Sequence, residues 1–450
     1  MSIKRQLFGT DGIRSVAGEY PLDRPTVYAI GCALGKWAKK TAAGGAAEIV
    51  IGMDTRESGP WIAEMVAGGA AQFGVTVRFA GLVTTPGVAY LTRSRDFVAG
   101  VMISASHNPF QDNGIKVFGH DGYKLSDDRE AEMETVIFEV LANKETPKPM
   151  SLTVDKGLDA AYVDFLASSF QGSLKGKKFV LDCANGASSH LAPELFERLG
   201  AEVITLSAEP DGRNINLGCG ALHPERLQKA VVETGADAGV AFDGDADRAM
   251  LVSASGRVVD GDHMLLIAAR ALKAQGKLPG DVVVATVMSN MGLEVALEAE
   301  GIRLDRTPVG DKYVLEEMIR IGAAIGGEQS GHVIFHEYAT TGDGMLTAMR
   351  IFEEMAKTGK SMDELAKGLE IYPQRLVNVR VREKKPMSDI PPVMDAIREC
   401  ESYFHGRGRV LVRYSGTEAL ARVMVEGPEL IHVERFAESV AAVLRHELGV

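Results

Sequence analysis

A pattern of short apolar runs occurs three times along the chain and constrains its fold more than any other feature. Each repeat begins with a β-branched run of strand length that ends at polar or glycine-rich residues. A second run follows after roughly the length of a βαβ crossover, so we predict buried parallel strands linked by helices. The first runs are residues 48–52, 179–181 and 282–285, and the second runs are residues 75–79, 202–206 and 302–304.

The third run of each repeat leads into a loop of polar residues. In open α/β sheets, ligands bind beyond the carboxyl ends of the strands. Three similar units that each offer such a loop are therefore expected to line one shared cleft. The third runs are residues 97–103, 238–242 and 323–325, and their loops are residues 104–109, 243–248 and 326–332.

The chain of 450 residues is too long for one hydrophobic core. We predict an α/β protein: three similar α/β domains with mixed, mostly parallel sheets, and a C-terminal α+β domain, around a central cleft. The last part shows strands at 373–382 and 409–426, a helix near 391–403 and an amphipathic helix at 430–448. The predicted domains are residues 1–150, 151–255, 256–370 and 371–450.

The net charge of −12 argues against a nucleic-acid binder, which normally has a basic face. No stretch approaches the ~20 apolar residues needed to span a bilayer, and the first residues lack the apolar core of a signal peptide. We therefore expect a cytoplasmic protein that binds neither nucleic acid nor a membrane. The four cysteines lack metal-ligand spacing, so buried or half-buried thiols are expected, and Cys219, between two glycines, is the candidate for an exposed thiol.

Three aspartates alternate along the loop of the second repeat: Asp243, Asp245 and Asp247. In an extended segment this spacing places three carboxylates on one side, where a cation is needed to stabilise them. Oxygen ligands without a nearby cysteine favour Mg²⁺. A calcium-binding EF-hand is excluded because the twelfth residue from Asp243 is Ala254 and not a glutamate. The alternative is a solvated acidic turn beside Arg248.

Ser106 lies in a Ser-His-Asn-Pro turn after the third run of the first repeat. The sequence has no Gly-x-Ser-x-Gly elbow, so a hydrolase triad is poorly supported. A serine nucleophile then needs a base or must work in a phosphorylated form. Taken alone, Ser106 is equally compatible with a simple turn. Lys116 is a candidate for phosphate binding or proton transfer, and its alternative is a surface lysine.

Two further segments offer ligands for a phosphosugar. Near the C-terminus, arginines, hydroxyls and a glycine suit phosphate, although a Ser-Gly hairpin turn has the same composition. In the loop of the third repeat, polar side chains suit sugar hydroxyls, although a capped loop is the alternative. The first set is Arg413, Ser415, Gly416, Thr417 and Arg422, and the second is Glu328, Ser330 and His332.

Taken in order, five strings resemble those of the α-D-phosphohexomutase superfamily. They run from the start to near the end of the chain, so the resemblance covers essentially all of it. No single string is decisive, but their order is very specific. The strings are residues 8–14, 103–109, 326–332, 341–344 and 422–427.

The resemblance implies that the four domains carry a phosphoserine, a metal, the sugar and a phosphate in turn. Ser106 would be the phosphoserine, and one of its oxygens would join the three aspartates around Mg²⁺. It would phosphorylate the free hydroxyl of the substrate, and the resulting hexose 1,6-bisphosphate would turn over and return its other phosphoryl group. Glu328 and Ser330 would bind the sugar, and the C-terminal set would grip the non-reacting phosphate. The catalytic candidates are Ser106, Lys116, His107, Arg248, His332 and Arg14.

Within the superfamily, Gln329 favours an amino sugar by resemblance. The implied reaction interconverts glucosamine 6-phosphate and glucosamine 1-phosphate, and feeds UDP-N-acetylglucosamine synthesis. One alternative is a phosphomannomutase or phosphoglucomutase, and another is a non-catalytic sugar-phosphate sensor. The expected partners are a phosphosugar and a hexose 1,6-bisphosphate, and a homodimer is also considered.

Three positions depart from the pattern of the superfamily. Ala246 replaces a glycine of the metal loop, and it is strained by roughly 1 kcal/mol if its φ is positive. Tyr414 and Ala419 replace prolines, so the phosphate loop is expected to be less rigid. None of the three changes removes a ligand.

Overall fold

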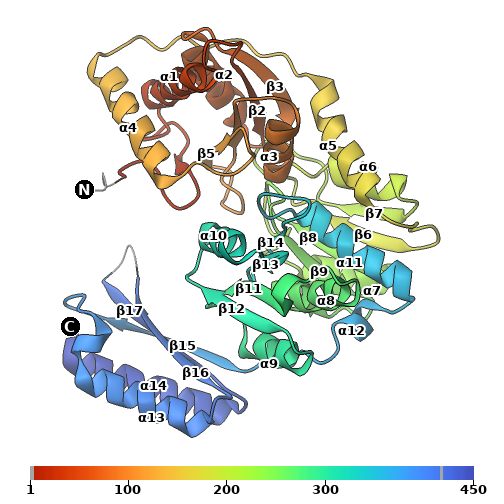
Figure 1. The fold of residues 1–450 in the computed structure, drawn as a ribbon, viewed down its shortest axis with the longest axis vertical. Coiled ribbons are helices and arrows are strands. Elements are labelled where there is room, and N and C mark those ends of the chain that lie inside the picture. Colours follow the sequence, from red (N-terminus) through yellow and green to blue (C-terminus); the bar gives the residue numbers. More distant parts are fainter. Residues whose placement is uncertain (1–4, 416–418) are drawn as a thin grey trace. The chain divides into compact units, whose positions relative to one another are not determined.

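The computed structural model describes residues 5–415 and 419–450 (Figure 1). The chain divides into two compact units. The first is Met1–Val287 with Asp305–Lys367, and the second is Met288–Leu304 with Gly368–Val450. In the part of the chain that the structure describes, no helix is long and apolar enough to cross a membrane.

The first sheet has five strands in the order β1-β5-β4-β2-β3. Strands β2, β3 and β4 run parallel, and β5 returns antiparallel beside β4. The strands are β1 (Ile13–Val16), β2 (Glu48–Met53), β3 (Thr76–Leu82), β4 (Ala99–Ile103) and β5 (Asp112–Gly119). The helices are α1 (Arg24–Thr41), α2 (Gly59–Ala71), α3 (Thr85–Ser94) and α4 (Asp127–Ala142).

Alternation along these strands sorts the helices onto two faces. Ile49 and Ile51 of β2 pack in one buried cluster with residues of α1, α2 and α4, which lie together (Figure 1). Gly52, the residue after Ile51 in β2, lies against Val88 of α3. Because side chains of a strand alternate between faces, α3 covers the opposite face. Both faces of the sheet are thus buried, which explains the continuous apolar runs in the sequence.

The second sheet repeats this design in the order β10-β9-β8-β6-β7. Phe179 of β6 stacks on Phe352 with ring centroids 4.0 Å apart, so a helix from much later in the chain covers one face. The strands are β6 (Lys178–Asp182), β7 (Glu202–Leu206), β8 (Ala238–Phe242), β9 (Ala249–Ser253) and β10 (Val258–Val259). The helices are α5 (Lys156–Ser169), α6 (Leu191–Arg198) and α7 (Glu225–Thr234).

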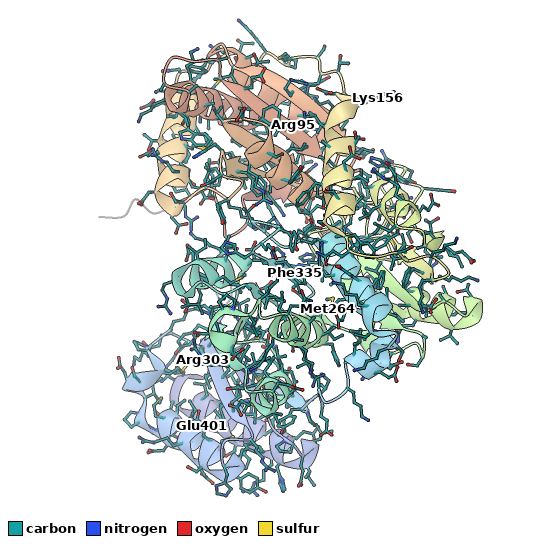
Figure 2. All side chains as sticks on the ribbon, turned by 45° about the vertical axis from the view of Figure 1, so that its right-hand side comes forward. Arg95, Lys156, Met264, Arg303, Phe335 and Glu401 are labelled. Carbon is teal, nitrogen blue, oxygen red and sulfur yellow. The ribbon has the colours of Figure 1, made fainter. Side chains whose placement is uncertain are left out.

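The third sheet has four strands in the order β12-β11-β13-β14. Its last long helix, α11, carries Phe352. The side chains of the described residues are drawn in Figure 2, where Met264 marks α8 and Phe335 marks the end of β14. The strands are β11 (Val282–Thr286), β12 (Arg303–Thr307), β13 (Ile325–Gly327) and β14 (Val333–Phe335). The helices are α8 (Gly261–Ala274), η1 (Pro279–Asp281), α9 (Met291–Ala299), α10 (Asp311–Ile321), α11 (Gly344–Thr358) and α12 (Met362–Leu365).

The C-terminal part forms an antiparallel sheet in the order β15-β17-β16. Its strands share one buried cluster with the two long helices α13 and α14. The strands are β15 (Gln374–Arg380), β16 (Arg409–Tyr414) and β17 (Leu420–Glu426), and the helices are η2 (Met387–Asp389), α13 (Pro391–Phe404) and α14 (Leu430–Leu448).

The predicted architecture of three similar α/β domains with mixed, mostly parallel sheets and a C-terminal α+β domain is confirmed. All nine predicted strands of the repeats are present. The sequence reading missed the antiparallel strand that closes each repeat, which is β5, β9 or β14. Each missed strand follows one of the three polar loops, at residues 104–109, 243–248 and 326–332. The polar residues of the loop obscure where the next apolar run begins.

All four cysteines are free and buried, and the expectation that Cys219 is exposed was wrong, since only 3% of it is accessible. Burial raises the pKa of the Cys183 and Cys400 thiols to about 12. We therefore expect almost no reaction of the native protein with Ellman's reagent at pH 8, and four thiols titrated after denaturation. Rapid reaction of one thiol in the native state would contradict the structure.

Candidate active site

The loop after β8 gathers three carboxylates in the interior. Asp243, Asp245 and Asp247 are all buried, and each offers an oxygen within 4.8 Å of the others. Ala246 between them has a φ of 55°, which is the left-handed conformation that the sequence comparison anticipated as strained. The Oδ1 atom of Asp245 accepts no hydrogen bond from the residues that the structure describes. Buried carboxylates with spare acceptor oxygen suit a metal ion.

The electrostatics of this loop differ from one carboxylate to the next. Burial raises the pKa of Asp243 well above its ordinary value, and the charges of Asp247 and Asp245 add to the effect. Burial also acts on Asp247, but Lys116, His332 and Arg248 outweigh it and hold the pKa of Asp247 well below its ordinary value. The solvated acidic turn considered above is therefore excluded, because these groups interact strongly inside the protein.

Lys116 on β5 supplies a positive charge to the cluster. Its Nζ lies 2.9 Å from Asp245 Oδ2, 3.4 Å from Asp247 Oδ2 and 3.1 Å from Asp11 Oδ2. Burial lowers the pKa of Lys116, but the three carboxylates outweigh it and hold that pKa well above its ordinary value. Lys116 is only 1% exposed, so the alternative of a surface lysine is excluded.

Ser106 faces this cluster from the loop after β4. Its Oγ donates a hydrogen bond of 2.5 Å to Asp243 Oδ2 and lies 3.3 Å from Nδ1 of His107. Ser106 has a φ of 53°, so its backbone is also left-handed. Arg248 Nη1 lies 3.3 Å from the same nitrogen of His107. Burial and the charges of Arg248 and Arg14 lower the pKa of His107, which favours a neutral ring beside the serine.

The loop that carries Ser106, residues 104–109, is called the serine loop. It is held in place by Arg56, which the sequence analysis did not select. This arginine is buried, and its guanidinium donates to the backbone carbonyls of Ser106 and Asn108 at 2.9 Å each. It also donates to Pro109 O and to the carboxylate of Asp54. The only sequence signal for Arg56 was its position just after the first strand of the repeat.

His332, in the loop after β13, is buried beside the loop of the three aspartates. Its Nε2 accepts a hydrogen bond of 2.9 Å from Gly342 N–H, and its Nδ1 lies 3.8 Å from Asp247 Oδ1. Burial lowers the pKa of His332, while Asp247 and two other carboxylates raise it overall. An acceptor nitrogen carries no proton, so this geometry describes a neutral ring with its Nδ1–H directed toward Asp247.

A cavity of about 400 Å³ opens beside these groups. It brings together Arg14, Arg248, Glu328 and His332, which the sequence analysis had selected. Ser330 is adjacent, with its Oγ 3.4 Å from Glu328 Oε2. The remaining lining residues are Leu7, Gly9, Thr10, Asp11, Gly12, Asp247, Val309, Gly310 and Asp311.

Two carboxylates of the cavity wall, Asp11 and Asp311, were not anticipated. Lys124 donates to both of them, and Asp11 also pairs with Arg14 and Lys116. These groups lie 113 and 187 residues from Lys124 in the sequence, so no local pattern indicated them. The network joins the first and third repeats at the cavity.

The remaining candidates lie in the second unit. Arg413 of β16 lies directly opposite Arg422 of the neighbouring strand β17 in the sheet register. The two side chains therefore share one face of that sheet. The phenol of Tyr414 accepts from Lys385 N–H and donates to Lys385 O, which gives this segment anchors where the superfamily has a proline. Lys384 donates to the carbonyl of Ser415 at 2.6 Å. Gly416 and Thr417 lie outside the described residues.

Four family models match the chain in succession. They are the phosphoglucomutase/phosphomannomutase α/β/α domain I at residues 5–144, domain II at 160–256, domain III at 260–372 and the C-terminal domain at 376–443. Together they cover most of the chain. The protein therefore belongs to the phosphoglucomutase/phosphomannomutase family of phosphohexomutases.

Two relatives that are more than half identical to this chain indicate which kind of phosphohexomutase it is. A phosphoglucosamine mutase of Solibacter usitatus is 63% identical over 445 residues, which is 99% of each chain. A phosphoglucosamine mutase of Koribacter versatilis is 51% identical over 99% of this chain and 98% of its own. Within the family, the chain thus groups with the phosphoglucosamine mutases, and it is an enzyme of the isomerase class.

Solved structures support the fold. A phosphoglucomutase/phosphomannomutase family protein from Burkholderia thailandensis superimposes with a TM-score of 0.81 at 24% identity, over 99% of both chains. A protein described as a putative phosphomannomutase from Thermus thermophilus gives a TM-score of 0.75 at 23% identity, over 99% of this chain and all of that one.

Proposed function

We propose that the protein interconverts glucosamine 6-phosphate and glucosamine 1-phosphate through a phosphorylated Ser106. The observation that carries the proposal is the 2.5 Å approach of Ser106 Oγ to Asp243, within a cluster of three buried carboxylates. Relatives named phosphoglucosamine mutases supply the identity of the sugar. The product would feed UDP-N-acetylglucosamine synthesis in the cytoplasm.

Each half of the reaction moves one phosphoryl group. The bond from phosphorus to Ser106 Oγ breaks as a bond to the free sugar hydroxyl forms; that hydroxyl loses its proton and the serine oxygen takes one up. The product of this step is a hexose 1,6-bisphosphate. After the bisphosphate turns over in the site, its other phosphoryl group returns to Ser106 and releases the isomeric monophosphate.

The three aspartates fit Mg²⁺, because hard oxygen donors are buried together and Asp245 Oδ1 has no hydrogen bond among the described residues. Asp243, Asp245 and Asp247 would hold the ion with one oxygen of the phosphorylated Ser106. Bound there, Mg²⁺ would withdraw negative charge from the phosphoryl oxygens.

Cationic and polar side chains around the cavity have complementary roles in this proposal. Lys116 and Arg248 would offset the charge of the transferring group, and Arg14 would extend that positive potential into the cavity. Lys116 and His332 remain the candidates for proton transfer, and His107 would orient the serine oxygen. Glu328 and Ser330 would bind sugar hydroxyls. In the second unit, the non-reacting phosphate would be bound by Arg413, Ser415, Gly416, Thr417 and Arg422.

Domain ranges and assembly belong to the same proposal. We assign the phosphoserine, metal, sugar and phosphate roles to residues 1–150, 151–255, 256–370 and 371–450. A homodimer is the proposed assembly, and light scattering coupled to gel filtration measures it directly. A monomeric mass at working concentrations would refute that assembly.

Turnover of three phosphosugars tests the proposed substrate. With Mg²⁺ and the matching hexose 1,6-bisphosphate, kcat/KM for glucosamine 6-phosphate is expected to exceed that for glucose or mannose 6-phosphate at least about tenfold. A preference for mannose or glucose would instead support a phosphomannomutase or phosphoglucomutase. Binding of all three without turnover would support the sensor.

A further inference from the structure

A segment of the second repeat reaches the serine loop of the first. Asn216, in the connection between β7 and α7, adopts the left-handed conformation with a φ of 59°. Its Nδ2 donates to Ser106 O at 2.9 Å and to Asn108 O at 3.1 Å. Its own backbone N–H donates to Ala184 O at 2.9 Å, so the residue is anchored at the end of β6 while its side chain spans to the first repeat.

The backbone carbonyls of Ser106 and Asn108 also accept hydrogen bonds from Arg56. Each carbonyl oxygen has two lone pairs, and here one is used by the guanidinium of the first repeat and the other by the amide of the second. A non-glycine residue in the left-handed region is strained and persists only when its surroundings determine it. The four hydrogen bonds are those surroundings for Ser106.

The loop of the three aspartates, residues 243–248, is called the metal loop, and its Gly244 packs against the carbonyl of Ser106. A Cβ on Gly244 would lie 2.5 Å from Ser106 O and 2.9 Å from Asn216 Nδ2. The backbone of the metal loop therefore packs against the same carbonyl that Asn216 holds. Ser106 O is thus the point where the serine loop, the metal loop and the Asn216 segment converge.

We propose that Asn216 is a positioning residue that fixes the serine loop against the metal loop. By holding Ser106 O, it keeps Ser106 Oγ on the side of Asp243. The inference rests on the proposed function, because it assigns Asn216 a part in phosphoryl transfer through Ser106. A residue that acts in this way affects the chemical step more than the binding of substrate.

Two substitutions test the role. Asn216→Asp keeps the shape and the tolerance for a left-handed backbone, but its carboxylate has no N–H to donate and repels both carbonyl oxygens. Asn216→Gly removes the amide and adopts the same backbone without strain, so it covers the case in which the aspartate variant folds poorly. Both are expected to lower kcat about 10- to 100-fold, with KM for glucosamine 6-phosphate changed less than about twofold.

The matched control is Asn214→Asp in the same segment. Among the described residues, the side chain of Asn214 forms hydrogen bonds within that segment alone, to Glu209 O and from Asp211 N–H. This variant should keep wild-type kcat and KM, with a thermal unfolding temperature close to those of the Asn216 variants.

Four outcomes would contradict the proposal or the function on which it rests. A wild-type kcat in Asn216→Gly, or an equal loss in Asn214→Asp, would overturn the positioning role. A rise in KM without a fall in kcat would assign Asn216 to substrate binding and overturn it as well. Absence of turnover in the wild-type enzyme and the control would refute the proposed function itself, which separates the two failures.

Discussion

Ser106→Ala is expected to lower kcat about 10⁴- to 10⁶-fold, because the oxygen that carries the phosphoryl group is removed. The hydroxyl makes its closest contact with Asp243, and the backbone of the loop is fixed by Arg56, so the fold should survive the change. Intact mass after incubation with glucose 1,6-bisphosphate measures the modification directly. The wild-type protein should gain one phosphate and the variant none.

Ser168→Ala is the matched control for this experiment. Ser168 is exposed on α5, and its hydroxyl donates to Phe165 O of the same helix. This variant should retain both the phosphate and the activity. A phosphate that persists in Ser106→Ala would show that another residue carries the group and would refute the assignment.

Asp245→Asn is expected to remove metal binding. The substitution keeps the size of the side chain but takes a negative charge from the centre of the cluster, where Lys116 already lies 2.9 Å from the carboxylate. Affinity for Mg²⁺ or Mn²⁺, measured by calorimetry, should fall at least about 100-fold. Turnover should become undetectable at millimolar Mg²⁺.

A second measurement separates loss of the ion from loss of the fold. A ligand that binds only the native state raises the unfolding temperature, so Mg²⁺ should stabilise the wild type and not the variant. Asp363→Asn, which alters a surface ion pair with Arg257, should respond to Mg²⁺ like the wild type. Unchanged Mn²⁺ affinity in Asp245→Asn would exclude the carboxylate cluster as the metal site.

The sequence predicted those features that follow from local patterns. Parallel strands buried on both faces appear as continuous apolar runs, and their carboxyl ends place loops together, so Ser106, Asp243 and Glu328 could be assigned to one region. The alternation of three aspartates after a buried strand indicated a need for a counter-charge, with a solvated acidic turn as the alternative. The strain at Ala246, which the sequence made conditional on a positive φ, is present, because its φ is 55°.

The sequence could not reveal groups that act across long distances in the chain. Arg56, Asn216 and Lys124 each contact partners at least 50 residues away, and as single polar residues in loops they carry no periodic signal. Tyr414 illustrates the same limit. The loss of a proline suggested a looser loop, but the phenol restores an anchor through Lys385 that only the tertiary structure reveals.

The carbonyl of Ser106 accepts hydrogen bonds from both Arg56 and Asn216, and this bears on when the active site is completed during synthesis of the chain. A ribosome releases the chain from its N-terminus, so Ser106 emerges 110 residues before Asn216 and 137 residues before Asp243. Until those residues arrive, the nascent first domain has the serine but lacks both the amide that fixes its carbonyl and the carboxylate that orients its hydroxyl. The surroundings of the Ser106 hydroxyl are therefore complete only when the residues of the second domain that contact it, up to Asp243, have been synthesised and have folded against the first domain.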